Sequence, residues 1–186
     1  MPPERAMAQH QDTDRIHAED RIDNDNLTRF RNMISSKVTN VILLTGGPGK
    51  TTMMPAIASD ILQKSFGRVL VIEPTVLAAR YAHEYMNAPG GFESGWFANR
   101  VHLQTGSEDR LDEDAPLTYT TPQVYWSWFI RDFRMDKSTS LFFDFNVVFI
   151  DINARPVAIE RLLIAVKSVR ERASSPIHFV LSATSR

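Results

Sequence analysis

Short apolar runs alternate with segments of helical periodicity along most of the chain, and this alternation limits the possible folds more than any other feature. The apolar runs have the length and residue types of buried strands and occupy residues 41–44, 69–72, 101–103, 117–120, 146–150 and 178–181. Helical patterns cover residues 26–36, 51–64, 76–86, 122–131 and 157–172, and Gly67 marks the end of the second. Because strands that alternate with helices form βαβ units, we predict an α/β fold with a mainly parallel sheet and helices on both faces.

Two of the predicted helices show which side faces the core. The helix at 157–172 places one apolar stripe along its length, made of Ile159, Leu162, Leu163, Val166 and Val169. The helix at 122–131 carries four aromatic residues, Tyr125, Trp126, Trp128 and Phe129. An exposed group of this kind would stack nucleic-acid bases, but the helical spacing favours packing in the core. The aromatic residues at positions 142, 143 and 145 are expected in the core as well.

Length and composition exclude several classes of protein. With 186 residues and 43% apolar residues, the chain fits one globular domain. The lack of cysteine excludes a disulfide scaffold and a cysteine-based zinc site, and the five histidines have no metal-ligand spacing. No apolar run is long enough to cross a bilayer, and the N-terminus lacks a secretory signal pattern. We therefore expect an intracellular protein, cytoplasmic or nuclear, without membrane contact.

The first 26 residues differ from the rest of the chain. They are polar and acidic, with seven acids and three bases, and almost no apolar periodicity. We interpret residues 1–26 as a mobile tail and residues 27–186 as one lobe. Since the net charge of the whole chain is −1, the lobe itself is weakly basic. That balance is compatible with phosphate contact but is poor evidence for it.

The segment TGGPGKTT, residues 45–52, lies between the first predicted strand and the second predicted helix. This is the context of a phosphate loop, in which glycines let backbone N–H groups turn toward phosphates and the helix N-terminus adds partial positive charge. Lys50 would then reach the β- and γ-phosphates of ATP, and the Thr51 hydroxyl would bind Mg²⁺. The complete set of predicted nucleotide-binding residues is Gly46, Gly47, Pro48, Gly49, Lys50, Thr51 and Thr52.

This segment departs from the usual phosphate-loop pattern at one position. The pattern has a glycine five residues before the Gly-Lys pair, and Leu44 stands there, so the loop reads as shortened by about two residues. A shorter loop supplies fewer N–H donors, which leaves nucleotide binding open. The alternative is a plain glycine turn between a strand and a helix. The succession of strand, loop, Lys-Thr and helix favours the phosphate loop.

Three further segments follow this loop along the chain, and their order is informative: VIEPTVLAAR at 71–80, GSEDRLDEDAPLTYTTPQV at 106–124 and FVLSAT at 179–184. Together with the loop, they resemble the first RecA-like lobe of DEAH-box superfamily 2 RNA helicases. Related lobes occur in positive-strand RNA virus polyproteins, and the two branches stay open. The resemblance covers about residues 28–186. It implies a RecA-like P-loop NTPase fold, ATP and Mg²⁺ as cofactors, and RNA as a partner.

The resemblance also implies a role for the acid that follows the fifth predicted strand. The family has D-E-x-H there, and this chain has Asp151-Ile152-Asn153-Ala154. Asp151 would hold Mg²⁺ through water and, with Lys50, form the catalytic set. The glutamate that activates the attacking water is replaced by Ile152, a loss that typically costs about 10²–10⁴-fold in rate. The alternative for Asp151 is a strand-end acid that caps a turn.

Nucleic-acid contact in such a lobe is mostly with sugar and phosphate, and it is therefore largely blind to sequence. The resemblance places it at Thr75, Arg80, Thr121 and Pro122, and assigns coupling between nucleotide and RNA to Ser182 and Thr184. Gln123 stands where the family has glycine, and its side chain would crowd the path of the RNA strand. For Arg80, a solvated helix face is an equally good interpretation.

Two functions remain open for the chain. It is either the N-terminal lobe of an ATP-dependent RNA helicase, as a fragment or degenerate copy, or a pseudo-helicase module that binds RNA or a protein partner without hydrolysing ATP. A helicase of this family needs a second RecA-like lobe, which this sequence lacks, to supply arginine fingers. Ile152 and the altered loop favour the second function. A small P-loop kinase would not explain the Ser-Ala-Thr and Glu-Asp-Arg segments.

Overall fold

The computed structural model describes residues 24–88, 100–106, 114–135, 145–153, 156–172 and 176–183. Most of the expected acidic tail lies outside these residues, and the first helix begins at Asn24. The elements in chain order are α2 (Asn24–Ile34), β1 (Val41–Thr45), α3 (Met53–Leu62), η1 (Gln63–Ser65), β2 (Val69–Ile72), α4 (Val76–Asn87), β3 (Val101–Leu103), β4 (Leu117–Thr120), α5 (Pro122–Met135), β5 (Val147–Asp151), α6 (Pro156–Arg172) and β6 (His178–Ala183).

The described strands form one sheet with the order β1-β6-β5-β2-β4-β3, and every pairing between neighbours is parallel. The strand that precedes the glycine-rich loop, β1, lies at one edge. Strand β6 separates it from β5, the strand that ends in Asp151. The α/β fold with a parallel sheet is therefore confirmed.

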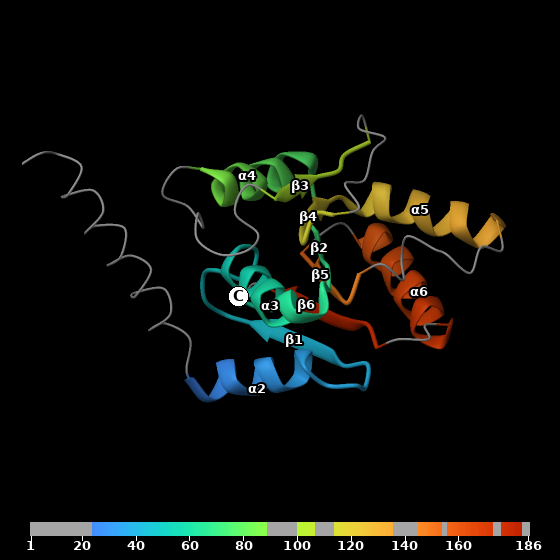
Figure 1. Ribbon diagram of the computed structural model, residues 1–186. Coiled ribbons are helices and arrows are strands. Elements are labelled where there is room, and N and C mark those ends of the chain that lie inside the picture. Colours follow the sequence, from blue (N-terminus) through green and yellow to red (C-terminus); the bar gives the residue numbers. More distant parts are fainter. Residues whose placement is uncertain are drawn as a thin grey trace, which may run out of the picture.

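Helices cover both faces of the sheet (Figure 1). Helices α2, α3 and α4 pack on one face, where Phe30, Met54 and Ala79 join a core that includes Val71 and Phe149 of the strands. Helices α5 and α6 pack on the other face around a second cluster with Leu70, Ile72, Val148 and Ile150. Alternate residues of β2 and β5 thus enter opposite cores. This explains why those strands are apolar at nearly every position.

The aromatic residues of α5 mainly belong to the second core, as predicted. Tyr125 and Trp128 are buried, and Trp126 and Phe129 are partly buried against the same cluster. Trp126 also stacks on Phe129, with 5.2 Å between ring centroids. Phe145, which precedes β5, is buried as well. Residues 142 and 143 lie outside the described part of the chain.

One member of the predicted stripe on α6 is placed differently. Leu162 and Ala165 are buried and Val166 is partly buried, but Leu163 is 46% exposed. Consecutive residues of a helix point about 100° apart, so a helix that turns Leu162 to the sheet turns Leu163 toward solvent. The prediction for Leu163 was wrong. The side chains of Ile159 and Val169 are not described.

The end of α3 also differs in detail from the expectation. The chain continues through the short 3-10 helix η1, and the left-handed residue is Phe66, with φ 53°. The Gly67 N–H donates to the Leu62 carbonyl at 3.1 Å. Gly67 is needed for space, because a Cβ there would lie 2.8 Å from Asn146 Oδ1 and 3.0 Å from Leu62 Cβ.

We predict that Gly67→Ala lowers the free energy of unfolding by about 1–3 kcal/mol, since the added methyl group must displace packed atoms. Chemical denaturation measures the loss. Gly106→Ala is the matched control, because a Cβ at Gly106 meets nothing within 4 Å. Equal stabilities of the two variants would contradict the packing argument.

Candidate functional site

The candidate residues lie together at the side of the sheet where the parallel strands have their carboxyl ends. The glycine-rich loop follows β1, Glu73 and Thr75 follow β2, Asp151 ends β5, and Ser182 lies near the end of β6. In open α/β sheets, ligands bind in the crevice outside these ends. The segments singled out from the sequence therefore converge in space at the edge where a ligand is expected.

The glycine-rich loop makes a tight turn that only glycine adopts readily. Gly46, Gly47 and Gly49 have φ values of 74°, 51° and 89°. Leu44, at the position where the pattern has glycine, lies within β1 and is partly buried, so the turn is made by the glycines after it. The Lys50 ammonium group folds back on this turn and donates to the Gly46 carbonyl and, at 2.7 Å, to the Gly47 carbonyl.

A cavity of about 850 Å³ lies beside this loop. Its walls are residues 45–50 of the loop, strand β1, the start of α3, one side of α2, and Tyr85 from α4. The volume falls in the range of small-molecule sites.

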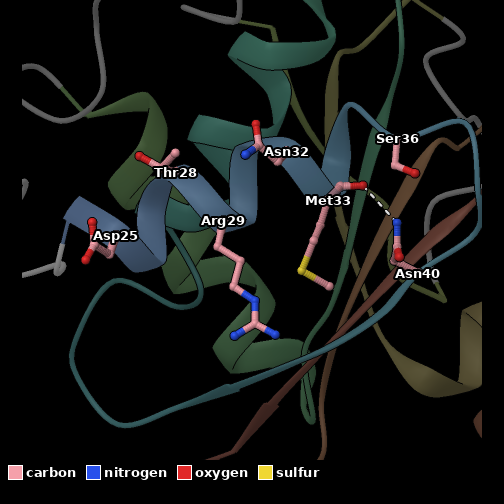
Figure 2. Close-up of a pocket in the computed structure, with 7 residues that line it drawn as sticks. All are labelled: Asp25, Thr28, Arg29, Asn32, Met33, Ser36 and Asn40. Carbon is pink, nitrogen blue, oxygen red and sulfur yellow. Dashed lines mark hydrogen bonds between the residues drawn. The ribbon is translucent and has the colours of Figure 1, made fainter.

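A separate hollow of about 540 Å³ lies along α2 (Figure 2). There Asn40 Nδ2 donates to the Met33 carbonyl at 3.0 Å, and Arg29 lines both spaces.

Thr51 lies just before α3, which packs across the sheet against β2 and β4. The Tyr119 hydroxyl, on β4, donates to the Thr51 carbonyl at 2.8 Å. Tyr119 is fully buried, and its pKa is raised well above the ordinary value by that burial and by nearby Glu73. Tyr119 therefore stays protonated and holds the backbone ahead of α3 at a fixed place over the strand ends.

Glu73 is the site residue that the sequence did not identify as functional. It is 5% exposed, and its N–H donates to the Thr120 carbonyl at 2.9 Å. Burial, and then the charge of Asp151, raise the pKa of Glu73 to about 7, although hydrogen bonding with the Thr51 side chain opposes the shift. The available signal was an acid directly after an apolar strand, the pattern that identified Asp151.

Asp151 ends β5 next to these groups. Its Oδ1 accepts from the Asn153 N–H at 2.8 Å and from Asn153 Nδ2 at 2.6 Å, so it does cap the turn after the strand. Both bonds use the same carboxylate oxygen. Ile152, which replaces the family's glutamate, is partly buried against the second core cluster. Ala154 lies outside the described residues.

Oxygen donors dominate this corner and suit Mg²⁺, which prefers carboxylate, hydroxyl and water oxygens. Thr51, Glu73 and Asp151 supply such atoms. Among the described residues, no group of three or more His, Cys, Asp or Glu side chains stands close enough to hold a metal alone. A Mg²⁺ ion would therefore keep water and ligand oxygens, as is usual for this ion with phosphates.

Ser182 pairs in register with Asp151, and its carbonyl accepts from the Ile152 N–H at 3.0 Å. Strand pairing thus brings the third motif beside the acid. Thr184, the other predicted coupling residue, lies outside the described part of the chain.

The predicted nucleic-acid residues differ in accessibility. Thr75 is exposed and caps α4, its Oγ1 accepting from the Ala78 N–H at 3.1 Å, and Arg80 is exposed on that helix. Thr121 is 2% exposed and Pro122 is buried at the start of α5, whereas Gln123 is exposed. Thr75 and Arg80 therefore present side chains to solvent, and Thr121 does not.

In the part of the chain that the structure describes, no helix is long and apolar enough to cross a bilayer.

Comparison with solved structures shows that the chain has the fold of helicase domains. It is similar to the DUF1998 helicase MrfA, in a crystal structure bound to DNA, with a TM-score of 0.59 and 16% identity over 84% of this chain. It is also similar to the Hef helicase domain of Pyrococcus furiosus, with a TM-score of 0.55 and 18% identity over 85% of this chain. The chain spans only 24% and 32% of the length of those chains. No protein-family model and no curated protein matches the sequence.

We predict that Glu73 makes the stability of the metal-free protein depend on pH. The ordinary pKa of 4.5 applies to the unfolded chain and a pKa of about 7 to the folded one, so the folded state keeps a proton that the unfolded state loses between these values. Stability should fall as pH rises through this window, by an amount on the order of 3 kcal/mol.

The test is the difference in melting temperature between Glu73→Gln and the parent, measured at pH 5 and pH 8. Because glutamine carries no charge, the variant should gain several degrees relative to the parent at pH 8 but not at pH 5. Glu84→Gln, at an exposed position of α4, is the control. A difference that does not change with pH would refute the assignment.

Proposed function

We propose that this chain is the N-terminal, nucleotide-binding lobe of an ATP-dependent RNA helicase. The observation that carries the proposal is the glycine-rich loop with three left-handed glycines and Lys50, set beside an 850 Å³ cavity and next to Thr51, Glu73 and Asp151. Lys50 would neutralise charge on the outer phosphates of ATP, and Thr51 and Asp151 would hold Mg²⁺. The ion would supply positive charge against the phosphate oxygens.

Binding of the phosphates must compete with two contacts within the lobe. Lys50 donates to the carbonyls of Gly46 and Gly47, and phosphate oxygens compete with those carbonyls for its ammonium group. The bonds to the carbonyls are charge-assisted by the ammonium group alone, whereas phosphate adds an opposite charge on the acceptor, so the exchange favours the ligand. The three glycines supply the backbone freedom for the loop to open around it.

A non-hydrolysing module is the second candidate, and the placement of Ile152 favours it. The family's water-activating carboxylate would stand at that position, but the side chain there packs against the core. The arginine fingers of a second lobe are a further requirement for fast phosphoryl transfer. RNA-stimulated phosphate release from this chain would eliminate the second candidate. Nucleotide binding without release would support it.

We propose RNA as the partner that contacts the exposed residues near the carboxyl ends of the strands. Thr75 and Arg80 lie in accessible positions on the loop and helix after β2. One of the two similar helicases is bound to DNA, whereas the motif order of this chain resembles RNA helicases. Contacts with sugar and phosphate position either nucleic acid without reading bases, so comparison of the two is part of the test.

For nucleotide binding, we expect Lys50→Ala to weaken the affinity for Mg-ATP by about 10–100-fold, the loss typical of a charge-assisted contact. Isothermal titration calorimetry measures it. Lys64→Ala removes an exposed lysine in η1, beyond the far end of α3, and should bind like the parent. Parent-like binding by Lys50→Ala would exclude the phosphate-loop assignment.

For RNA, we expect Arg80→Ala to weaken binding of single-stranded RNA and to reduce the slope of log affinity against log salt by about one. Fluorescence anisotropy with RNA and DNA of the same sequence provides the measurement. Lys37→Ala is the control, because Lys37 is exposed before β1, at the opposite edge of the sheet. An unchanged salt slope in Arg80→Ala would place the nucleic acid elsewhere.

A further inference from the structure

We propose that His178 and Asn40 form a proton-sensitive latch: the neutral His178 ring holds the Asn40 side chain on the end of α2, and a proton on that ring releases it. The latch fixes the helix that lines the cavity beside the glycine-rich loop. The inference rests on the proposed function, because it makes nucleotide affinity depend on the protonation of a residue outside the nucleotide site. Neither the sequence motifs nor the structural similarities assign a role to these two residues.

Asn40 connects α2 to the sheet. Its side-chain Nδ2 donates to the Met33 carbonyl, in the last turn of α2, at 3.0 Å and to the Val38 carbonyl at 2.8 Å. Figure 2 shows the first of these bonds. The Asn40 carbonyl is bonded to the sheet, since it accepts from the Phe179 N–H of β6 at 2.9 Å. Both hydrogens of the amide are therefore used to hold the turn between α2 and β1.

The His178 ring lies directly beside this amide. The residue is 2% exposed, and its Nδ1 accepts from the Asn40 backbone N–H at 3.4 Å and lies 3.3 Å from Asn40 Nδ2. Because a backbone N–H can only donate, Nδ1 must present a lone pair, and the neutral ring carries its hydrogen on Nε2. The His178 backbone has little freedom to adjust, since its N–H donates to the Asn146 carbonyl at 2.8 Å.

A proton on Nδ1 would reverse this arrangement. The ring would then direct an N–H at two groups that are themselves donors, the backbone N–H and the side-chain amide of Asn40. Since the backbones of both residues are bonded to neighbouring strands, the Asn40 side chain is the part that can turn. Turning it brings Oδ1 toward the ring and removes the donor from the Met33 carbonyl. The last turn of α2 thus loses its bond to the sheet.

In the described part of the chain, no charged side chain contacts the ring. Arg68 is turned away, with its guanidinium 4.6 Å from the centre of the Phe145 ring. Strand β1 has no charged residue, and the acid of β5, Asp151, lies at the opposite end of that strand from Val147, which pairs with His178. The charged residues of α2, the following turn, α3 and η1 are all exposed: Asp25, Arg29, Arg31, Lys37, Asp60 and Lys64.

The surroundings of the ring favour its neutral form. Burial lowers the pKa of His178 from its ordinary value of 6.5, although hydrogen bonding with the backbone of Ser36 and Ile34 opposes the shift. The unfolded chain therefore takes up this proton at a higher pH than the folded chain does. The neutral ring stabilises the fold above pH 6.5, and that contribution is lost as the pH falls below it.

The latch reaches the nucleotide cavity through α2. Asn26, Arg29, Phe30 and Met33 of this helix line the cavity beside the glycine-rich loop. Met33 is thus both part of the cavity wall and the residue whose carbonyl the latch holds. Phe30 and Ile34 are buried, so release of the latch loosens the last turn of α2 without detaching the helix. A nucleotide should bind more tightly to the neutral form, in which the wall is already ordered.

The first experiment needs no nucleotide. NMR follows the titration of the His178 ring together with the amide protection factors of Ser35 and Ser36, which donate to the Arg31 and Met33 carbonyls in the last turn of α2. Protection factors remove the pH dependence of intrinsic exchange. We expect the protection of both amides to fall by about 5-fold or more, with the midpoint of the ring titration. That midpoint should lie below pH 6.5.

The second experiment measures the affinity for Mg²⁺ and a non-hydrolysable ATP analogue by calorimetry, at pH 8 and at one pH unit below the NMR midpoint. His178→Asn places an acceptor oxygen where Nδ1 stands and takes up no proton in this range, so its latch should stay closed. The parent should match this variant at pH 8 and bind about 5-fold or more weakly than it at the lower pH. Comparison at equal pH cancels the protonation of the nucleotide and of other residues.

Two further variants complete the series. His178→Phe removes the acceptor and should bind the analogue weakly at both pH values, because the Asn40 donors lose their partner. His102→Gln is the matched control, since β3 lies at the opposite edge of the sheet from β1, and it should show the pH dependence of the parent. Circular dichroism and thermal melting check that each variant folds.

The outcomes separate this inference from the proposed function. Unchanged protection of Ser35 and Ser36 on protonation of the ring would overturn the inference and leave the nucleotide site intact. A ring that stays neutral down to acid unfolding would do the same, as would a ratio of parent to His178→Asn affinities that is constant with pH. If His178→Asn does not fold, the NMR titration of the parent still decides whether the latch opens. No binding of the analogue by the parent at either pH would overturn the proposed function, and the nucleotide-free NMR measurement would then decide on the latch alone.

Discussion

Parallel hydrogen bonding between β1, β6, β5 and β2 makes the chain cross the sheet after each strand, so all of these strands end at one edge. The glycine-rich loop, Glu73, Asp151 and Ser182 meet there although they are far apart in the sequence. Helices on both faces are the other consequence, because a parallel connection needs a crossover. The site is thus a result of the strand pairing and not of any single segment.

The same edge concentrates charge where burial makes charge costly. Two carboxylates lie near each other, and burial raises the pKa of one of them, Glu73, to about 7. A lobe selected only for stability would place apolar residues there, as it does at Ile152. A buried carboxyl group whose pKa is raised beside a second acid is a feature that many functional sites share. The Thr51–Tyr119 contact, which fixes the helix start above these acids, connects the fold to the site.

Most secondary structure was predictable, because the length of an apolar run and the periodicity of apolar residues are strong local signals. Strands at 69–72, 101–103 and 117–120 have the bounds expected from the sequence. Leu163 was placed wrongly, since periodicity gives a wide stripe and only the packing of α6 decides which residue is central. The left-handed residue is Phe66 and not the expected Gly67, and the close approach of Asn146 that requires glycine at position 67 is visible only in the folded chain.

Sequence alone determined the alternation of strands and helices, the glycine-rich loop with Lys50 and Thr51, and the acid at Asp151, because each is encoded in a short stretch of residues. Only the tertiary structure decided that Glu73 is buried beside the strand that ends in Asp151, that Tyr119 holds the Thr51 backbone, and that Ile152 packs against the core. These contacts join residues on different strands and helices. The physical reason is that strand order and the path of α3 across the sheet set such distances, and neither is written in local pattern.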